Sequence, residues 1–185
     1  MLEPADRDAL IHDVVERELV MFLNTRNEGG TASCQENPEM FRNWRWMVFS
    51  VMSDDYILSY QHDLQEAEKN GRNFMVEKYA RMDNLIPCVS PNMDKVRAIV
   101  AAERVWLVAL SQEFPTLFPD QTGRFDFYFS AEMETLSEAS LDQYLLCIDA
   151  AKRDGRNLAK ERYANMYDRM GLGTLEEAEA KRRGQ

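Results

Sequence analysis

Two glutamates occupy the apolar faces of two predicted helices, and no other feature of the sequence points so strongly to chemistry. The first stripe comprises Ile11, Val14, Val15, Glu18 and Phe22, and the second comprises Val96, Ile99, Val100, Glu103 and Leu107. Both follow the spacing i, i+3, i+4, i+7, i+11, which is one face of an α-helix. A buried carboxylate is costly unless it is paired, hydrogen-bonded, protonated or bound to a metal. We therefore take Glu18 and Glu103 as candidate catalytic residues.

Four arrangements could accommodate these carboxylates, and the sequence leaves all four open. Arg45 lies on the apolar face of the next predicted helix, so a buried Glu18–Arg45 ion pair is the simplest. Tyr79 and Tyr163 could instead donate hydrogen bonds to the glutamates. A carboxylate-bridged metal site needs Glu-x-x-His motifs, which the sequence lacks, so we predict neither a bound transition metal nor a cofactor. General acid–base catalysis in a central cavity is the fourth arrangement.

The segment 27–35 provides further polar candidates. A thiol such as that of Cys34, when it lies near a helix N-terminus, can become a nucleophile, although a small buried residue that closes a loop is the plainer interpretation. Loops carry function more often than core does, and this loop has no match at 112–125 in the second half of the chain. The candidate substrate-binding residues are Arg45, Tyr79, Tyr163, Glu28, Cys34 and Gln35.

An internal repeat organises the elements that must position these residues. Residues 71–82 resemble residues 155–166 at an offset of 84, and the first helix of each half matches at an offset of 85. A half of this length contains no sizeable core alone. We therefore expect one domain over residues 1–185, with halves at about 8–84 and 93–170, produced by tandem duplication.

The fold class predicted from this pattern is all-α, a single pseudo-two-fold bundle of about eight helices. Gly (8) and Pro (6) are scarce, which favours helices. We expect a loop at 114–123 that leads into an aromatic stretch at 125–129, and a helix that begins at Ser90-Pro91. The predicted helices lie at about 8–24, 38–52, 54–70, 73–83, 91–112, 138–153, 157–170 and 175–183.

The sequence also resembles a known family. The residues that carry the resemblance are Asn27-Glu28-Gly29-Gly30 and Ala32-Ser33-Cys34-Gln35, followed by Phe41, Arg45, Phe49 and Glu77-Lys78-Tyr79-Ala80-Arg81-Met82. They are similar to the bacterial domain-of-unknown-function family 4125 over nearly the whole chain. In the second predicted helix the resemblance leads us to expect a glutamine where this chain has Val48, so that position is no candidate. The resemblance implies no reaction and singles out segment 27–35.

Composition narrows the classes of partner. Lys and Arg total 22 against 32 Asp and Glu, a formal charge of −10, which disfavours nucleic acid. No apolar run is long enough to span a bilayer, no signal peptide is recognised, and three cysteines without a CxxC pair suit free thiols in the cytoplasm. The sequence leaves open whether the chain forms a homo-oligomer.

These features lead to two functional hypotheses. In the first, the chain is a cytoplasmic protein that binds a small molecule in a cavity between its two halves and processes it by acid–base chemistry, with Arg45 fixing an anionic group of the substrate. In the second, it is a non-catalytic module whose acidic surface engages a partner protein. A deep polar cavity with a trapped ligand favours the first hypothesis, and a packed centre with an exposed aromatic patch favours the second.

Overall fold

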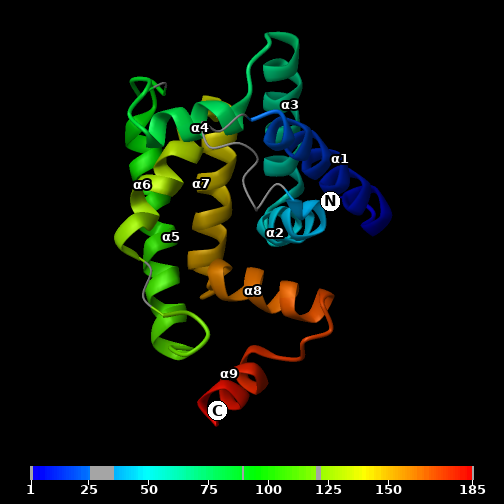
Figure 1. Ribbon diagram of the computed structural model, residues 1–185, viewed down its shortest axis with the longest axis vertical. Coiled ribbons are helices and arrows are strands. Elements are labelled where there is room, and N and C mark those ends of the chain that lie inside the picture. The colour runs from blue at the N-terminus through cyan, green and yellow to red at the C-terminus, as the bar shows by residue number, and fades with distance from the viewer. Residues whose placement is uncertain (1, 26–35, 89, 120–121, 185) are drawn as a thin grey trace.

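The computed structural model describes residues 2–25, 36–88, 90–119 and 122–184 (Figure 1). Within these ranges it contains nine helices and no strand, so the predicted all-α class is confirmed. The helices are α1 (Pro4–Leu23), α2 (Pro38–Ser50), α3 (Asp54–Lys69), α4 (Phe74–Met82), α5 (Met93–Glu113), α6 (Thr122–Met133), α7 (Glu138–Arg153), α8 (Leu158–Arg169) and α9 (Leu175–Arg183).

Matching capping residues begin α4 and α8. Asn73 accepts hydrogen bonds from the backbone N–H groups of Met75 and Val76, and Asn157 accepts one from that of Lys160. Both asparagines follow a glycine that ends the preceding helix with a φ of +66°, a left-handed backbone conformation that strongly favours glycine. The predicted helix stop and asparagine cap are therefore present in both halves.

The same asparagines fasten α4 and α8 to the long helices. The Asn73 amide donates to the carbonyl oxygen of Met21 in α1 at 2.8 Å, and the Asn157 amide donates to that of Trp106 in α5 at 3.0 Å. Met21 and Trp106 occupy matching positions of the two repeated long helices. The cap thus sets both where each short helix begins and where it lies on its neighbour.

The structure adds one helix that was not predicted and moves the start of another. Helix α6 occupies residues 122–133, where we expected the end of a loop and an aromatic stretch without a helix. Its four aromatic residues within five positions have only moderate helix propensity, and the turn residues before them hid the helix signal. Helix α5 begins at Met93, after Asn92, because the Ser90 hydroxyl accepts the Asn92 N–H in the turn that precedes the helix.

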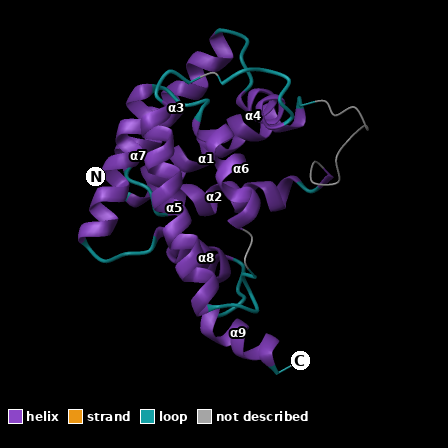
Figure 2. Ribbon diagram, turned by 90° about the vertical axis from the view of Figure 1, so that its left-hand side faces the viewer, coloured by secondary structure: helices purple, strands orange, loops and turns teal. Residues whose placement is uncertain are grey.

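Contacts between the helices follow a two-fold pattern. The pairs α1–α2, α1–α3 and α1–α4 correspond to α5–α6, α5–α7 and α5–α8. Across the halves, α2 packs on α8 as α6 packs on α4, and α3 packs on α7 (Figure 2). This pattern is the one expected of the predicted repeat, and descent by duplication remains a prediction.

Most helices close around one core, whereas α9 lies at the end of the molecule beyond α8 (Figures 1 and 2). The Glu179 carboxylate of α9 accepts the backbone N–H groups of Thr116 and Leu117, which fastens this helix to the segment after α5. Among the described residues, no helix is both long and apolar enough to cross a membrane.

Candidate functional site

Glu18 of α1 is completely buried. It forms an ion pair with Arg45, which was the simplest of the four arrangements predicted from the sequence. The Arg45 guanidinium of α2 donates from Nε to Glu18 Oε2 at 2.7 Å and from Nη2 to Glu18 Oε1 at 2.6 Å. The Tyr60 hydroxyl of α3 donates to Oε1 at 2.7 Å. Both carboxylate oxygens therefore have charge-assisted partners, which offsets the desolvation of the buried charge.

Arg45 also extends the ion pair across the molecule. Its Nη1 donates to Glu132 Oε1 of α6 at 2.9 Å, and Lys78 Nζ of α4 donates to Glu132 Oε2 at 2.5 Å. The same ammonium lies 3.6 Å from the centroid of the Tyr128 ring, a cation–π contact. One chain of alternating charges thus joins α1, α2, α6 and α4.

Glu103 is buried in α5 and has a simpler set of partners. Arg162 of α8 donates from Nη1 and Nη2 to the two carboxylate oxygens, each at 2.6 Å. The Tyr144 hydroxyl of α7 donates to Oε1 at 2.6 Å and accepts from Arg162 Nη2 at 3.1 Å. The bidentate pair and the phenol occupy both oxygens of this carboxylate.

We call these two hydrogen-bonded clusters together the polar network, to which each of the first eight helices contributes one side chain. Its members are Glu18, Arg45, Tyr60, Lys78, Glu103, Glu132, Tyr144 and Arg162. Three cations face three carboxylates, so the network carries no net charge when all six are ionised. This balance is what makes its burial tolerable.

Electrostatics within the network favours the charged forms of Glu132 and Lys78. Burial alone raises the pKa of Glu132, but the charges of Arg45 and Lys78 outweigh burial and hold that pKa well below its ordinary value. Burial lowers the pKa of Lys78, yet Glu132 more than compensates and the pKa ends above the ordinary value. Burial raises the pKa of Tyr60 and Tyr144, so both phenols keep their protons.

A cavity of about 480 Å³ lies against the polar network. Helices of both halves wall it, and the wall residues recur in pairs that match in the repeat: Phe41 and Phe125, Trp44 and Tyr128, Tyr79 and Tyr163, Lys78 and Arg162. The space therefore lies where the two halves meet. Nine of its 21 lining residues are aromatic, and its charged groups come from the network.

The predicted site residues fall into three groups. Arg45, Glu103, Tyr79 and Tyr163 line the cavity. Glu18 does not line it and lies behind Arg45, so the expectation that Glu18 faces the cavity is wrong. The remaining candidates, Glu28, Cys34 and Gln35, lie outside the described residues.

One predicted hydrogen-bonding pattern is also corrected. The phenols that donate to the two buried glutamates are Tyr60 and Tyr144, whereas Tyr79 and Tyr163 lie in the cavity wall. Tyr60 and Tyr144 occupy matching repeat positions, so the signal was present in the sequence. Each lies on the buried face of its helix and within reach of the glutamate on the neighbouring long helix.

Sequence reasoning missed three charged members of the network, and the repeat contains a signal for each. Lys78 and Arg162 occupy matching repeat positions, so a basic residue at this position of both halves could have been recognised as a partner for the glutamates. Glu132 matches Val48 in the repeat. Extending the repeat through the residues of α2 would therefore have predicted helix α6 and placed Glu132 within it. The second half thus replaces an apolar residue with a charge.

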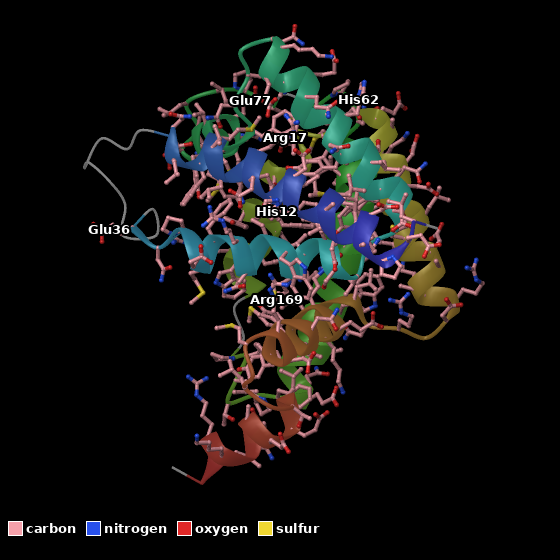
Figure 3. The ribbon with its side chains drawn as sticks, turned by 90° about the vertical axis from the view of Figure 1, so that its right-hand side faces the viewer. His12, Arg17, Glu36, His62, Glu77 and Arg169 are labelled. Carbon is pink, nitrogen blue, oxygen red and sulfur yellow. The ribbon has the colours of Figure 1, made fainter. Side chains whose placement is uncertain are left out.

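The histidines lie outside this site. His12 and His62 are exposed on α1 and α3 (Figure 3), and neither lines the cavity. In the same view Arg169 of α8 lies where this helix meets α2, and its guanidinium is 4.3 Å from the centroid of the Trp46 ring. Over the described ranges, no group of three or more His, Cys, Asp or Glu is arranged to hold a metal ion.

Comparisons with known proteins give one positive result. A family model described as a protein of unknown function (DUF4125) matches residues 8–180, which include every member of the polar network. No curated protein and no solved structure matches the chain.

Proposed function

The chain belongs to the DUF4125 family of proteins of unknown function, and we therefore propose a function from its geometry: it binds a small molecule in the cavity between α1–α4 and α5–α8. One observation carries the proposal. A cavity of ligand-binding size is walled by aromatic rings from both halves and touches a buried network of paired charges.

The energetics of the network supports a role in recognition. Replacing a buried ion pair with apolar residues of similar volume is often neutral or stabilising, so such pairs are weak contributors to stability. Here five charged side chains of the network reach the same cavity: Arg45, Lys78, Glu103, Glu132 and Arg162. A cavity with apolar walls and a few convergent polar groups is the usual form of a small-molecule site.

The contacts support binding roles for the network residues, and we propose no proton transfer. Glu103 has both carboxylate oxygens engaged by Arg162 and Tyr144, and Glu18 is separated from the cavity by Arg45. We therefore assign these two glutamates, taken as catalytic candidates from sequence, to holding the arginines in place. The proposal places the protein in the cytoplasm, where free thiols stay reduced.

A second function, an interaction module with an acidic surface, is the alternative. The formal charge of −10 is its main support. Val20, Val105 and Leu146 are exposed on three different helices, and scattered exposed residues are ordinary on a protein surface. The exposed aromatic side chains Trp44 and Tyr128 line the cavity itself. The cavity therefore favours small-molecule binding.

Native mass spectrometry of the purified protein, combined with elemental analysis, tests the proposal. We expect a retained small molecule in the wild type and its loss in Val48→Trp, which fills the cavity. Val105→Trp is the matched control, because Val105 lies on the exposed face of α5 and should leave binding unchanged. Equal retention by all three proteins would place the ligand elsewhere. A wild type that retains nothing, and that no compound of a diverse library stabilises in thermal melts, would contradict the proposal.

A further inference from the structure

The charge balance of the polar network limits what the cavity can accept. Three cations and three carboxylates are already paired, and Arg45, the predicted anchor for an anionic group, is shared between Glu18 and Glu132. A charged ligand placed against these groups would add a charge without a free counter-ion. Holding an unpaired charge away from water is unfavourable, so an uncharged ligand fits the network better.

The network nevertheless presents a polar edge to the cavity at Arg45 and Glu132. Their side chains are 12% and 13% exposed, against 10% for Arg162, 4% for Lys78 and 3% for Glu103. Arg45 uses three of its five N–H groups on Glu18 and Glu132, and each Glu132 oxygen accepts one of the network's hydrogen bonds. Arg45 and Glu132 therefore keep unused hydrogen-bond donors and acceptors next to each other.

Aromatic rings define the shape of the space around this edge. Trp44 and Tyr163 meet edge to face at 6.0 Å, and Phe125 and Phe129 stack at 5.2 Å. All four line the cavity. Such walls favour a flat, largely apolar body, which can stack on the ring faces and meet the ring edges.

Building on the proposed function, we infer that the ligand is an uncharged planar molecule with a neighbouring hydrogen-bond donor and acceptor, of the carboxamide or lactam class. Its N–H group donates to Glu132, its carbonyl oxygen accepts from Arg45, and its ring lies among the aromatic walls. The arrangement deepens the proposed function by assigning the class of ligand and the pair of residues that selects it.

Three probes of the same shape and different charge test this inference: naphthalene carboxamide, naphthalene carboxylate and naphthylmethylammonium. We measure their dissociation constants for the wild type by isothermal titration calorimetry at neutral pH. The carboxamide should bind about tenfold or more tightly than either ion. A wild type that prefers the carboxylate or the ammonium probe, or that fails to discriminate among the three, would overturn the inference while leaving small-molecule binding intact.

Two variants that change the network charge in opposite directions sharpen the test. Glu132→Gln gives the network a charge of +1 and should shift the preference toward the carboxylate, whereas Lys78→Met gives −1 and should shift it toward the ammonium probe. Circular dichroism melts establish whether each variant is folded before titration. If a variant is unfolded, the wild-type ranking of the three probes remains the test. Unchanged preferences in two folded variants would contradict the inference. Equal affinity of Val48→Trp and wild type for the carboxamide would instead refute the cavity as the site.

Discussion

At the scale of residues, the two halves pair their buried glutamates with basic residues in different ways. In the second half Glu103 meets Arg162 directly from α8. In the first half the matching basic residue, Lys78, pairs with Glu132, and Arg45 of α2 takes its place beside Glu18. The arrangement in the first half links four charges in a row. Loss of one of these side chains therefore leaves a neighbouring charge buried without its partner.

Glu18→Ala should therefore destabilise the protein by about 3 to 5 kcal/mol, because Arg45 then loses a buried counter-ion and Tyr60 loses its acceptor. Glu18→Gln should cost less, since an amide oxygen can still accept one of these hydrogen bonds. Urea denaturation measures both changes.

The control for this prediction is Asp94→Ala, which breaks an ion pair with Arg97 on the surface of α5 and should change stability by less than about 1 kcal/mol. A Glu18→Ala protein as stable as this control would show that the buried pair contributes nothing.

At the scale of elements, the last helix is held by a group that responds to pH. Burial raises the pKa of Glu179 in α9, but hydrogen bonds from Thr116, Leu117 and Arg183 outweigh burial and lower that pKa to about 2. A lowered pKa means that the docked helix favours the ionised carboxylate. The hydrogen bonds that hold α9 through Glu179 are therefore complete when the pH is above 4.5, the ordinary pKa of a glutamate. They weaken as the pH falls toward the lowered pKa of about 2.

We expect α9 to detach at low pH before the core unfolds. Hydrogen-exchange protection factors for amides of α9 should fall between about pH 6 and about pH 2.5, while those of the buried helix α3 stay high. Glu179→Gln serves as the control, because a neutral amide should make the protection of α9 independent of pH in this range. Loss of protection in α3 and α9 together would indicate global acid unfolding instead.

At the scale of the whole molecule, packing between the halves is as extensive as packing within either half. α2 lies on α8, α4 lies on α6, and α3 lies on α7. Even the hydrogen bonds correspond: Arg81 donates to Glu134 between α4 and the end of α6, and Asn165 donates to Ser50 between α8 and α2, at matching positions of the repeat. Removal of one half would expose the apolar faces of three helices of the other half.

Residues 1–86 and 87–185, expressed separately, should therefore lack a cooperative thermal transition, whereas an equimolar mixture should regain both helicity and the transition. Circular dichroism and sedimentation velocity measure this recovery. The chain with its connection intact is the reference for stability. Two halves that each melt cooperatively as monomers would show two domains, contrary to the expected single domain.

Local patterns in the sequence determined where most helices lie and which faces they bury. The apolar stripes around Glu18 and Glu103 and the asparagine caps at Asn73 and Asn157 could be recognised because they depend on residues three to eleven positions apart. The same stripes placed two carboxylates in the core and suggested Arg45 as a partner. Within α6 this signal failed, because aromatic residues on all sides leave no clear apolar face.

The partners of those carboxylates, and the cavity beside them, were decided only by tertiary structure. Glu132 reaches Arg45 across 87 positions and Lys78 across 54, and neither contact follows from helical periodicity. Which of several basic residues meets which carboxylate depends on how α2, α4, α6 and α8 cross. A space lined by both halves exists only once these helices have packed, because its shape is set by side chains that no local pattern relates.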